Sequence, residues 1–134
     1  MRFAIALGLA ILLAASAHSA DDPNIPKEEK AAVQKAMQAH IDANRVGEKY
    51  VIYDGVEGEL LRLGFVELHA GVVRKGEFYV SCADFTSADG TMIDVDFLVA
   101  GEKEDLRVLD AIVHKVAGTK RPYRVEETPS ESKD

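Results

Sequence analysis

The hydrophobic period of this 134-residue chain changes at Gly47, and that change constrains the fold more than any other feature. Before it, Val33, Met37 and Ile41 recur at the spacing of an amphipathic helix. After it, apolar residues recur at every second position, as in residues 93–99, which is the period of a strand. A single helix followed by strands must bury its apolar side against one face of a sheet.

The helical segment is predicted to run from about Pro26 to Arg45. Proline is favoured in the first turn of a helix, where its missing N–H is not needed. Glu28 and Glu29 place negative charge near the positive end of the helix dipole. Gly47 favours termination shortly after the last apolar residue.

About five strands joined by short turns are expected after the helix, and short connections make neighbouring strands antiparallel. They are predicted at residues 50–53, 60–73, 78–85, 93–99 and 106–116. The pairs Lys75-Gly76 and Asp89-Gly90 are predicted as the central residues of two turns. The second strand is too long to stay flat in so small a chain, and Gly64 and Gly71 mark sites for a bulge or bend.

These elements predict one α+β domain over residues 21–125, with the N-terminal helix packed on a curved antiparallel meander of about five strands. Residues 126–134 consist of polar and charged residues and one proline, and they are predicted to be a disordered tail.

The predicted arrangement resembles cystatin-like α+β roll domains over about residues 26–117. The segments 80–85, 94–97 and 114–116 are also similar to those of uncharacterised exported bacterial proteins. The Gln-Val-x-Val-Gly and Pro-Trp loops of cystatins are missing from the sequence, which has no Trp. The resemblance therefore implies a roll fold and carries no inhibitor function with it.

The first twenty residues have the pattern of a secretory signal peptide. Arg2 precedes an uncharged apolar run, residues 3–15, that is shorter than the roughly 20 residues of a membrane-spanning helix. The small-x-small rule favours cleavage after Ala17. The acidic pair Asp21-Asp22 favours cleavage after Ala20 instead. We expect a periplasmic or secreted protein without stable membrane insertion after cleavage, and an uncleaved N-terminal anchor is the alternative.

The charge and cysteine content restrict the partners. The chain carries 23 acidic against 16 basic residues, a net charge of −7, and such a surface repels nucleic acid. Cys82 is the only cysteine, so an internal disulfide is excluded. Cys82 is expected either to be buried or to pair with another molecule. A homodimer formed through sheet edges, with Cys82 buried or crosslinking, is a further expectation.

The two turns, centred as above, define a strand register. The first turn places His69 opposite Cys82 and Glu67 opposite Asp84. The second places Cys82 opposite Phe97. On this register the polar residues share the predicted core face, although a slip of one residue would move them to the other face.

His69, Cys82 and Asp84 are candidate metal ligands, because imidazole, thiolate and carboxylate groups bind transition metals. A His–Cys pair beside a carboxylate also favours an activated thiolate. The catalytic candidates are His69, Asp84 and His114, where His114 approaches His69 only if the sheet curls enough. The alternative interpretation is structural: core histidines with hydrogen-bond partners, and a buried thiol. No Cys-x-x-Cys or His-Glu-x-x-His spacing is present.

Three carboxylates, Asp84, Asp94 and Asp96, surround the second predicted turn. Close carboxylates serve as general acid and base or bind Ca²⁺. The simpler interpretation is that Asp94 and Asp96 alternate with apolar neighbours and therefore point to solvent.

Phosphate-binding glycine loops and a nucleophile elbow are missing from the sequence. The expected function is therefore an exported domain that binds a protein or small-molecule ligand, without a cofactor and without catalysis. The alternative is a small enzyme or metal-binding protein that uses the His69, Cys82 and Asp84 cluster on the sheet.

Overall fold

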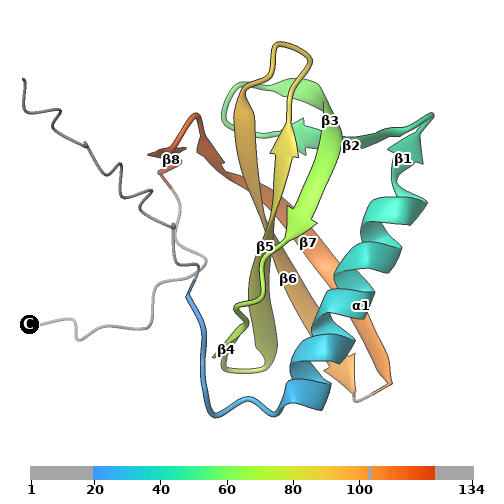
Figure 1. Cartoon of the computed structure of the whole chain (residues 1–134), viewed down its shortest axis with the longest axis vertical. Coiled ribbons are helices and arrows are strands. Elements are labelled where there is room, and N and C mark those ends of the chain that lie inside the picture. The colour runs from blue at the N-terminus through green and yellow to red at the C-terminus, as the bar shows by residue number, and fades with distance from the viewer. Residues whose placement is uncertain (1–19, 103, 123–134) are drawn as a thin grey trace, which may run out of the picture.

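The computed structural model describes residues 20–102 and 104–122, which form one helix beside an antiparallel sheet (Figure 1). The predicted signal segment up to residue 19 and the predicted tail at 126–134 lie outside the described residues. Within these ranges, no helix has the length and apolar character needed to cross a membrane. The α+β fold with an N-terminal helix is confirmed.

The helix α1 extends over Lys27–Ala43, close to the predicted range, with Pro26 at the N-cap position. It ends before Gly47 because Asn44 caps it: the Asn44 backbone N–H donates to the carbonyls of His40 and Ile41, and its side-chain amide donates to the His40 carbonyl at 2.8 Å. The helix contributes three buried apolar side chains to the core: Val33, Met37 and Ile41.

Eight strands form one antiparallel sheet with the order β1-β2-β3-β5-β6-β7-β8, and β4 pairs with β5 beside this path. The strands are β1 (Arg45–Val46), β2 (Lys49–Asp54), β3 (Glu59–Leu68), β4 (Val73–Lys75), β5 (Phe78–Thr86), β6 (Met92–Glu102), β7 (Asp105–Val116) and β8 (Thr119–Lys120). The expected number of about five was too low because β1, β4 and β8 are too short to produce an alternating pattern.

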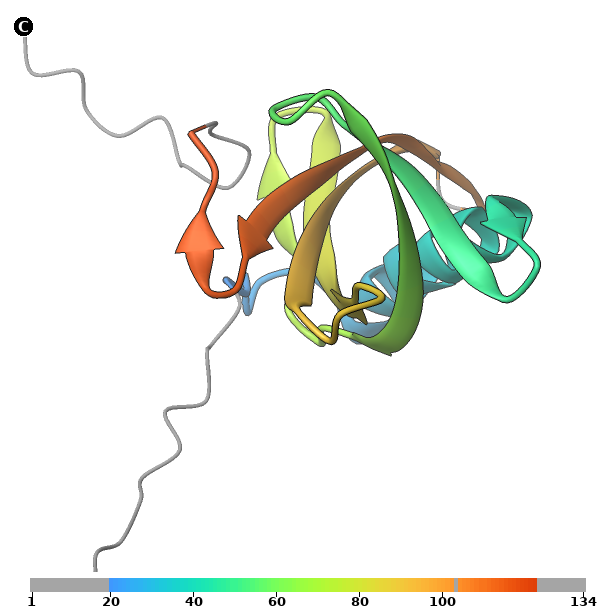
Figure 2. The same cartoon turned by 90° about the horizontal axis from the view of Figure 1, so that it is seen from above.

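The sheet curves around an interior, and α1 lies along one side of it against β5, β6 and β7 (Figure 2). The long predicted strand at 60–73 is interrupted in two places. A register shift in β3 between Phe65 and Glu67 follows shortly after Gly64, and the chain leaves the ladder between β3 and β4, around Gly71. Bulges increase the local twist, which lets β2 come into contact with β7.

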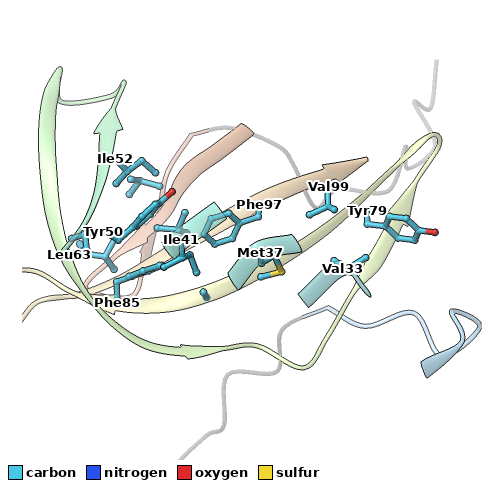
Figure 3. Packing of buried hydrophobic residues seen from close by; sticks show 14 of the residues in the cluster. Val33, Met37, Ile41, Tyr50, Ile52, Leu63, Tyr79, Phe85, Phe97 and Val99 are labelled. Carbon is cyan, nitrogen blue, oxygen red and sulfur yellow. The ribbon is translucent and has the colours of Figure 1, made fainter. Parts of the chain in front are cut away.

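The core lies between α1 and the sheet face that it covers, and the three buried side chains of α1 point toward the aromatic rings of the strands (Figure 3). Tyr50 stacks on Phe85 with ring centroids 5.0 Å apart, and Phe97 packs beside both. Burial of each large apolar side chain contributes about 1.5–3 kcal/mol to stability.

One largely buried charged pair connects the end of the described chain to β2. The side chain of Asp54 is 2 % exposed and accepts a hydrogen bond of 2.8 Å from Arg121 Nη2. The backbone N–H of Arg121 donates to the carbonyl of His114 in β7. Arg121 therefore connects the end of β2 to β7.

Candidate functional site

The loop between β5 and β6 determines which face of the sheet carries the polar residues. It is one residue longer than a two-residue turn: the Ser87 N–H donates to the Thr91 carbonyl, and Gly90 has a φ of 82°. Cys82 therefore lies opposite Asp96, not opposite Phe97. The predicted register between these strands was wrong by one residue, which reverses the face of every side chain.

The predicted placement of the candidates on the core face is consequently wrong. Ala83, Val95 and Phe97 point into the core, so the residues between them point away from α1. We call this side the outer face of the sheet. Cys82 and Asp96 lie on it and are nevertheless buried, with exposures of 2 % and 0 %.

The turn predicted at Lys75-Gly76 also lies one residue away from its predicted position, although the strand pairing that it predicted around His69 is correct. Lys75 pairs with Phe78, so the central turn residues are Gly76 and Glu77. The irregular segment between β3 and β4 compensates for the shift. Glu67 lies opposite Asp84 and the His69 backbone N–H donates to the Cys82 carbonyl, as the sequence predicted.

The imidazole of His69 lies between a thiol and a carboxylate. Its Nδ1 is 2.6 Å from Cys82 Sγ, and its Nε2 is 2.8 Å from Asp84 Oδ1. The His69 and Asp84 side chains are 15 % and 24 % exposed. In the tautomer that donates Nε2–H to Asp84, the Nδ1 lone pair points toward the sulfur.

A second polar group adjoins this one on β6 and β7. Asp96 Oδ1 is 3.1 Å from His114 Nδ1, and Asp94 is half-buried two residues before Asp96 on the same face. The interpretation of Asp94 and Asp96 as solvent-facing residues is therefore wrong. Their strand is covered on its outer face as well as on its core face.

A bulge in β7 positions His114. The register moves from Val95–Val113 to Asp94–Lys115, so His114 is the additional residue. Such a bulge redirects a side chain. We expected that His114 could approach His69 only if the sheet curled enough to bring the outer strands together. The structure groups His114 with Asp94 and Asp96 rather than with His69, and β3, β5, β6 and β7, which carry the candidates, are consecutive neighbours in the sheet.

These six side chains are named the outer-face cluster: His69, Cys82, Asp84, Asp94, Asp96 and His114. Two trios in it have ligand atoms within 4.8 Å of one another: His69, Cys82 and Asp94, and Asp94, Asp96 and His114. Asp94 belongs to both trios. Asp84 belongs to neither trio, and its contact is with the far side of the His69 ring.

The third described histidine has a different environment. His40 packs beside Tyr50 and Phe97, and its Nε2 is 3.0 Å from the Tyr50 hydroxyl. Burial lowers the pKa of His40 below its usual value and raises that of Tyr50. Both groups therefore remain uncharged at neutral pH. Tyr50 belongs to the core, and the half-buried His40 packs against it.

A cavity between α1 and the β6–β7 turn has none of the cluster residues in its lining. Three of its lining residues contact one another: the Tyr79 hydroxyl donates to Glu29 at 2.9 Å, and Arg74 lies over the Tyr79 ring at 5.1 Å. The outer-face cluster is therefore the stronger candidate for chemistry.

Comparison with protein-family models, curated proteins and solved structures finds no significant match to this chain. The function is consequently inferred from the chemistry of the outer-face cluster.

Proposed function

We propose that this protein binds a divalent transition-metal ion of the zinc class through His69, Cys82 and Asp94, which we call the first position. One observation supports this most directly: an imidazole nitrogen, a sulfur and a carboxylate oxygen lie within 4.8 Å of one another. Zinc takes these three ligand types, whereas Ca²⁺ and Mg²⁺ prefer oxygen alone. Three protein ligands leave one position of a tetrahedral ion for water or a ligand.

The contact between His69 and Asp84 supports the same proposal. Histidines that bind a metal generally donate their other ring N–H to a carboxylate or carbonyl, which fixes the ring and its tautomer. Asp84 is placed at Nε2, and Nδ1 faces Cys82. The role of Asp84 in this proposal is therefore to position His69, rather than to bind the ion.

Binding requires a small rearrangement. Sulfur and nitrogen atoms bound to one tetrahedral zinc ion are about 3.5 Å apart, given bonds of about 2.3 and 2.1 Å. Cys82 Sγ and His69 Nδ1 are 2.6 Å apart, so these two side chains must separate by about 1 Å.

The short contact between Cys82 and His69 also favours a second candidate function, an activated thiol. In this function, Cys82 is the nucleophile and His69 is the base beside it. Asp84 is the acid that orients His69. Against it, Cys82 is only 2 % exposed, which hinders attack on a substrate.

Metal analysis of the purified protein, prepared without chelators, tests the proposal. We expect native mass spectrometry to show bound zinc, and Co²⁺ substitution to produce a thiolate-to-cobalt charge-transfer band. Cys82→Ser should abolish the band, and Asp105→Asn, which alters an exposed carboxylate in β7, should leave it unchanged. Absence of metal binding, combined with rapid alkylation of Cys82 in the wild type, would favour the activated thiol instead.

A further inference from the structure

The second trio of the outer-face cluster has its own set of metal-binding groups. Asp94 and Asp96 are alternate residues of β6 on the outer face, and the β7 bulge places His114 beside them. Two carboxylates and one imidazole form a harder set than the first position, suited to Zn²⁺, Fe²⁺ or Mn²⁺. We call this trio the second position.

The distance between Asp96 and His114 in the second position matches that between two ligands of one metal ion. Ligand atoms bound at about 2.1 Å are roughly 3.0–3.4 Å apart around one ion. Asp96 Oδ1 and His114 Nδ1 are 3.1 Å apart, so these two atoms need no rearrangement to bind the same ion.

Burial distinguishes the second position from a surface group of acidic residues. The Asp96 side chain is 0 % exposed and that of His114 is 8 % exposed. Burial of a carboxylate is costly unless positive charge lies close to it. A cation bound by Asp96 and His114 would add positive charge to their existing contact, where water has been largely removed.

Asp94 connects the two positions. A carboxylate has two oxygens, and in two-metal sites such a group bridges ions about 3.5–4 Å apart. Asp94 has a ligand atom within reach of both trios. We infer that the outer-face cluster is a two-metal centre, with Asp94 as the bridging carboxylate between a thiolate–imidazole position and a carboxylate–imidazole position.

This inference rests on the proposed function, because the two positions share Asp94. The two-metal centre adds a second ion, bound by Asp96 and His114. It also makes the two ions differ in their ligands. The ion of the first position has a thiolate ligand, and the ion of the second position has none. The two ions are therefore distinguishable by spectroscopy.

Titration of the metal-free protein with Co²⁺ tests the second position. We expect native mass spectrometry to show two bound ions in the wild type. Asp96→Asn and His114→Gln should each reduce this number to one and retain the thiolate-to-cobalt band. Cys82→Ser should remove the band and retain the ion of the second position. Asp105→Asn is the control and should bind two ions.

Electron paramagnetic resonance tests the bridge in the wild type, without any variant. Two Co²⁺ ions that share a carboxylate are magnetically coupled, so the second equivalent should alter the signal of the first. A signal that simply doubles would overturn the bridging role of Asp94.

The outcomes separate the two proposals. One bound ion with the thiolate band, unchanged in His114→Gln, would overturn the second position and leave the proposed function intact. No bound ion and no band in the wild type would overturn both. Circular dichroism of each variant verifies folding, and the stoichiometry of the wild type decides the question if a variant fails to fold.

Discussion

The strands β5 and β6 carry the packed core on one face and the outer-face cluster on the other. On the core face, Phe85 and Phe97 pack against the helix and against Tyr50. On the outer face, Asp84 and Asp96, each of which directly precedes one of these phenylalanines, contact histidines. The alternation of side chains in a strand places both sets only one residue apart along the chain.

The two faces depend on geometry to different degrees. Apolar contacts are non-directional, so the core tolerates small shifts. The polar contacts of the outer face require particular atoms at particular distances, such as His69 Nε2 at 2.8 Å from Asp84. We therefore expect core substitutions to affect folding stability and outer-face substitutions to affect metal binding. Five predictions test this separation, in decreasing order of the expected effect.

Truncation of the core should have the largest effect on stability. Phe97→Ala removes a fully buried ring and should lower the free energy of unfolding by about 3–5 kcal/mol. Chemical denaturation measures this change. Leu109→Ala, at a position 69 % exposed, is the control and should change stability by about 0.5 kcal/mol or less. Similar losses in both variants would show that this face is not the core.

The buried ion pair is a polar exception on the core face. Arg121→Met leaves the buried carboxylate of Asp54 without its arginine partner and should cost about 3 kcal/mol. The double variant Arg121→Met with Asp54→Leu should recover much of this loss, because it removes the isolated charge. Urea unfolding of the four proteins of this cycle gives the coupling energy. No recovery would mean that packing of Arg121, rather than its charge, is what matters.

Zinc bound at the outer-face cluster should stabilise the folded protein. A zinc concentration about 100 times the Kd should raise the free energy of unfolding by about 2.7 kcal/mol, because the ion binds the folded state. Thermal unfolding with and without zinc measures the gain. Cys82→Ser should lose the part of this gain that comes from the first position and retain the part that comes from the second, and Asp105→Asn should retain the whole gain. An equal gain in Cys82→Ser and the wild type would show that zinc does not bind at the first position.

Asp84 should affect metal affinity rather than folding. Asp84→Asn weakens the contact that orients His69 and should reduce metal affinity by about 10–100-fold. Glu67→Gln, which alters the exposed carboxylate opposite Asp84 in the register, is the matched control. Competition with a zinc-binding dye measures both affinities. Equal affinity in Asp84→Asn and the wild type would contradict the positioning role.

The smallest expected effect is a pH dependence from His40, which is half-buried against the core. Burial lowers the pKa of His40 in the folded protein below 6.5, so the unfolded chain binds the proton first. Stability from this group is present above about pH 6.5 and is lost as the pH falls through the lowered pKa. Urea unfolding between about pH 8 and about pH 5 should show a weaker pH dependence in His40→Gln than in the wild type. Identical slopes would contradict this contribution.

The helix was predictable because its signals are local. The spacing of Val33, Met37 and Ile41 identified its apolar side, and all three are fully buried. Its end was placed slightly too late, because the capping contacts of Asn44 with His40 stop the helix before Gly47.

The register was less predictable, because Asp89-Gly90 fits two kinds of hairpin. The pair suits both a two-residue turn and a three-residue loop with glycine in the left-handed region. The structure has the longer loop, and this one residue moves Cys82 from the predicted core face to the outer face. Nothing local in the sequence distinguishes the two loops.

The sequence by itself determined the helix and the alternation of the strands, because these depend on near neighbours in the chain. It also identified His69, Cys82 and Asp84 as candidates, although their contact depends on the irregular segment between β3 and β4, which offsets the shift of the first turn. Only the tertiary structure determined that Asp94 and His114 join them. Their approach depends on the register of β5 with β6 and on the β7 bulge. Both features are fixed by the packing of the whole sheet against α1, which acts between residues far apart in the sequence.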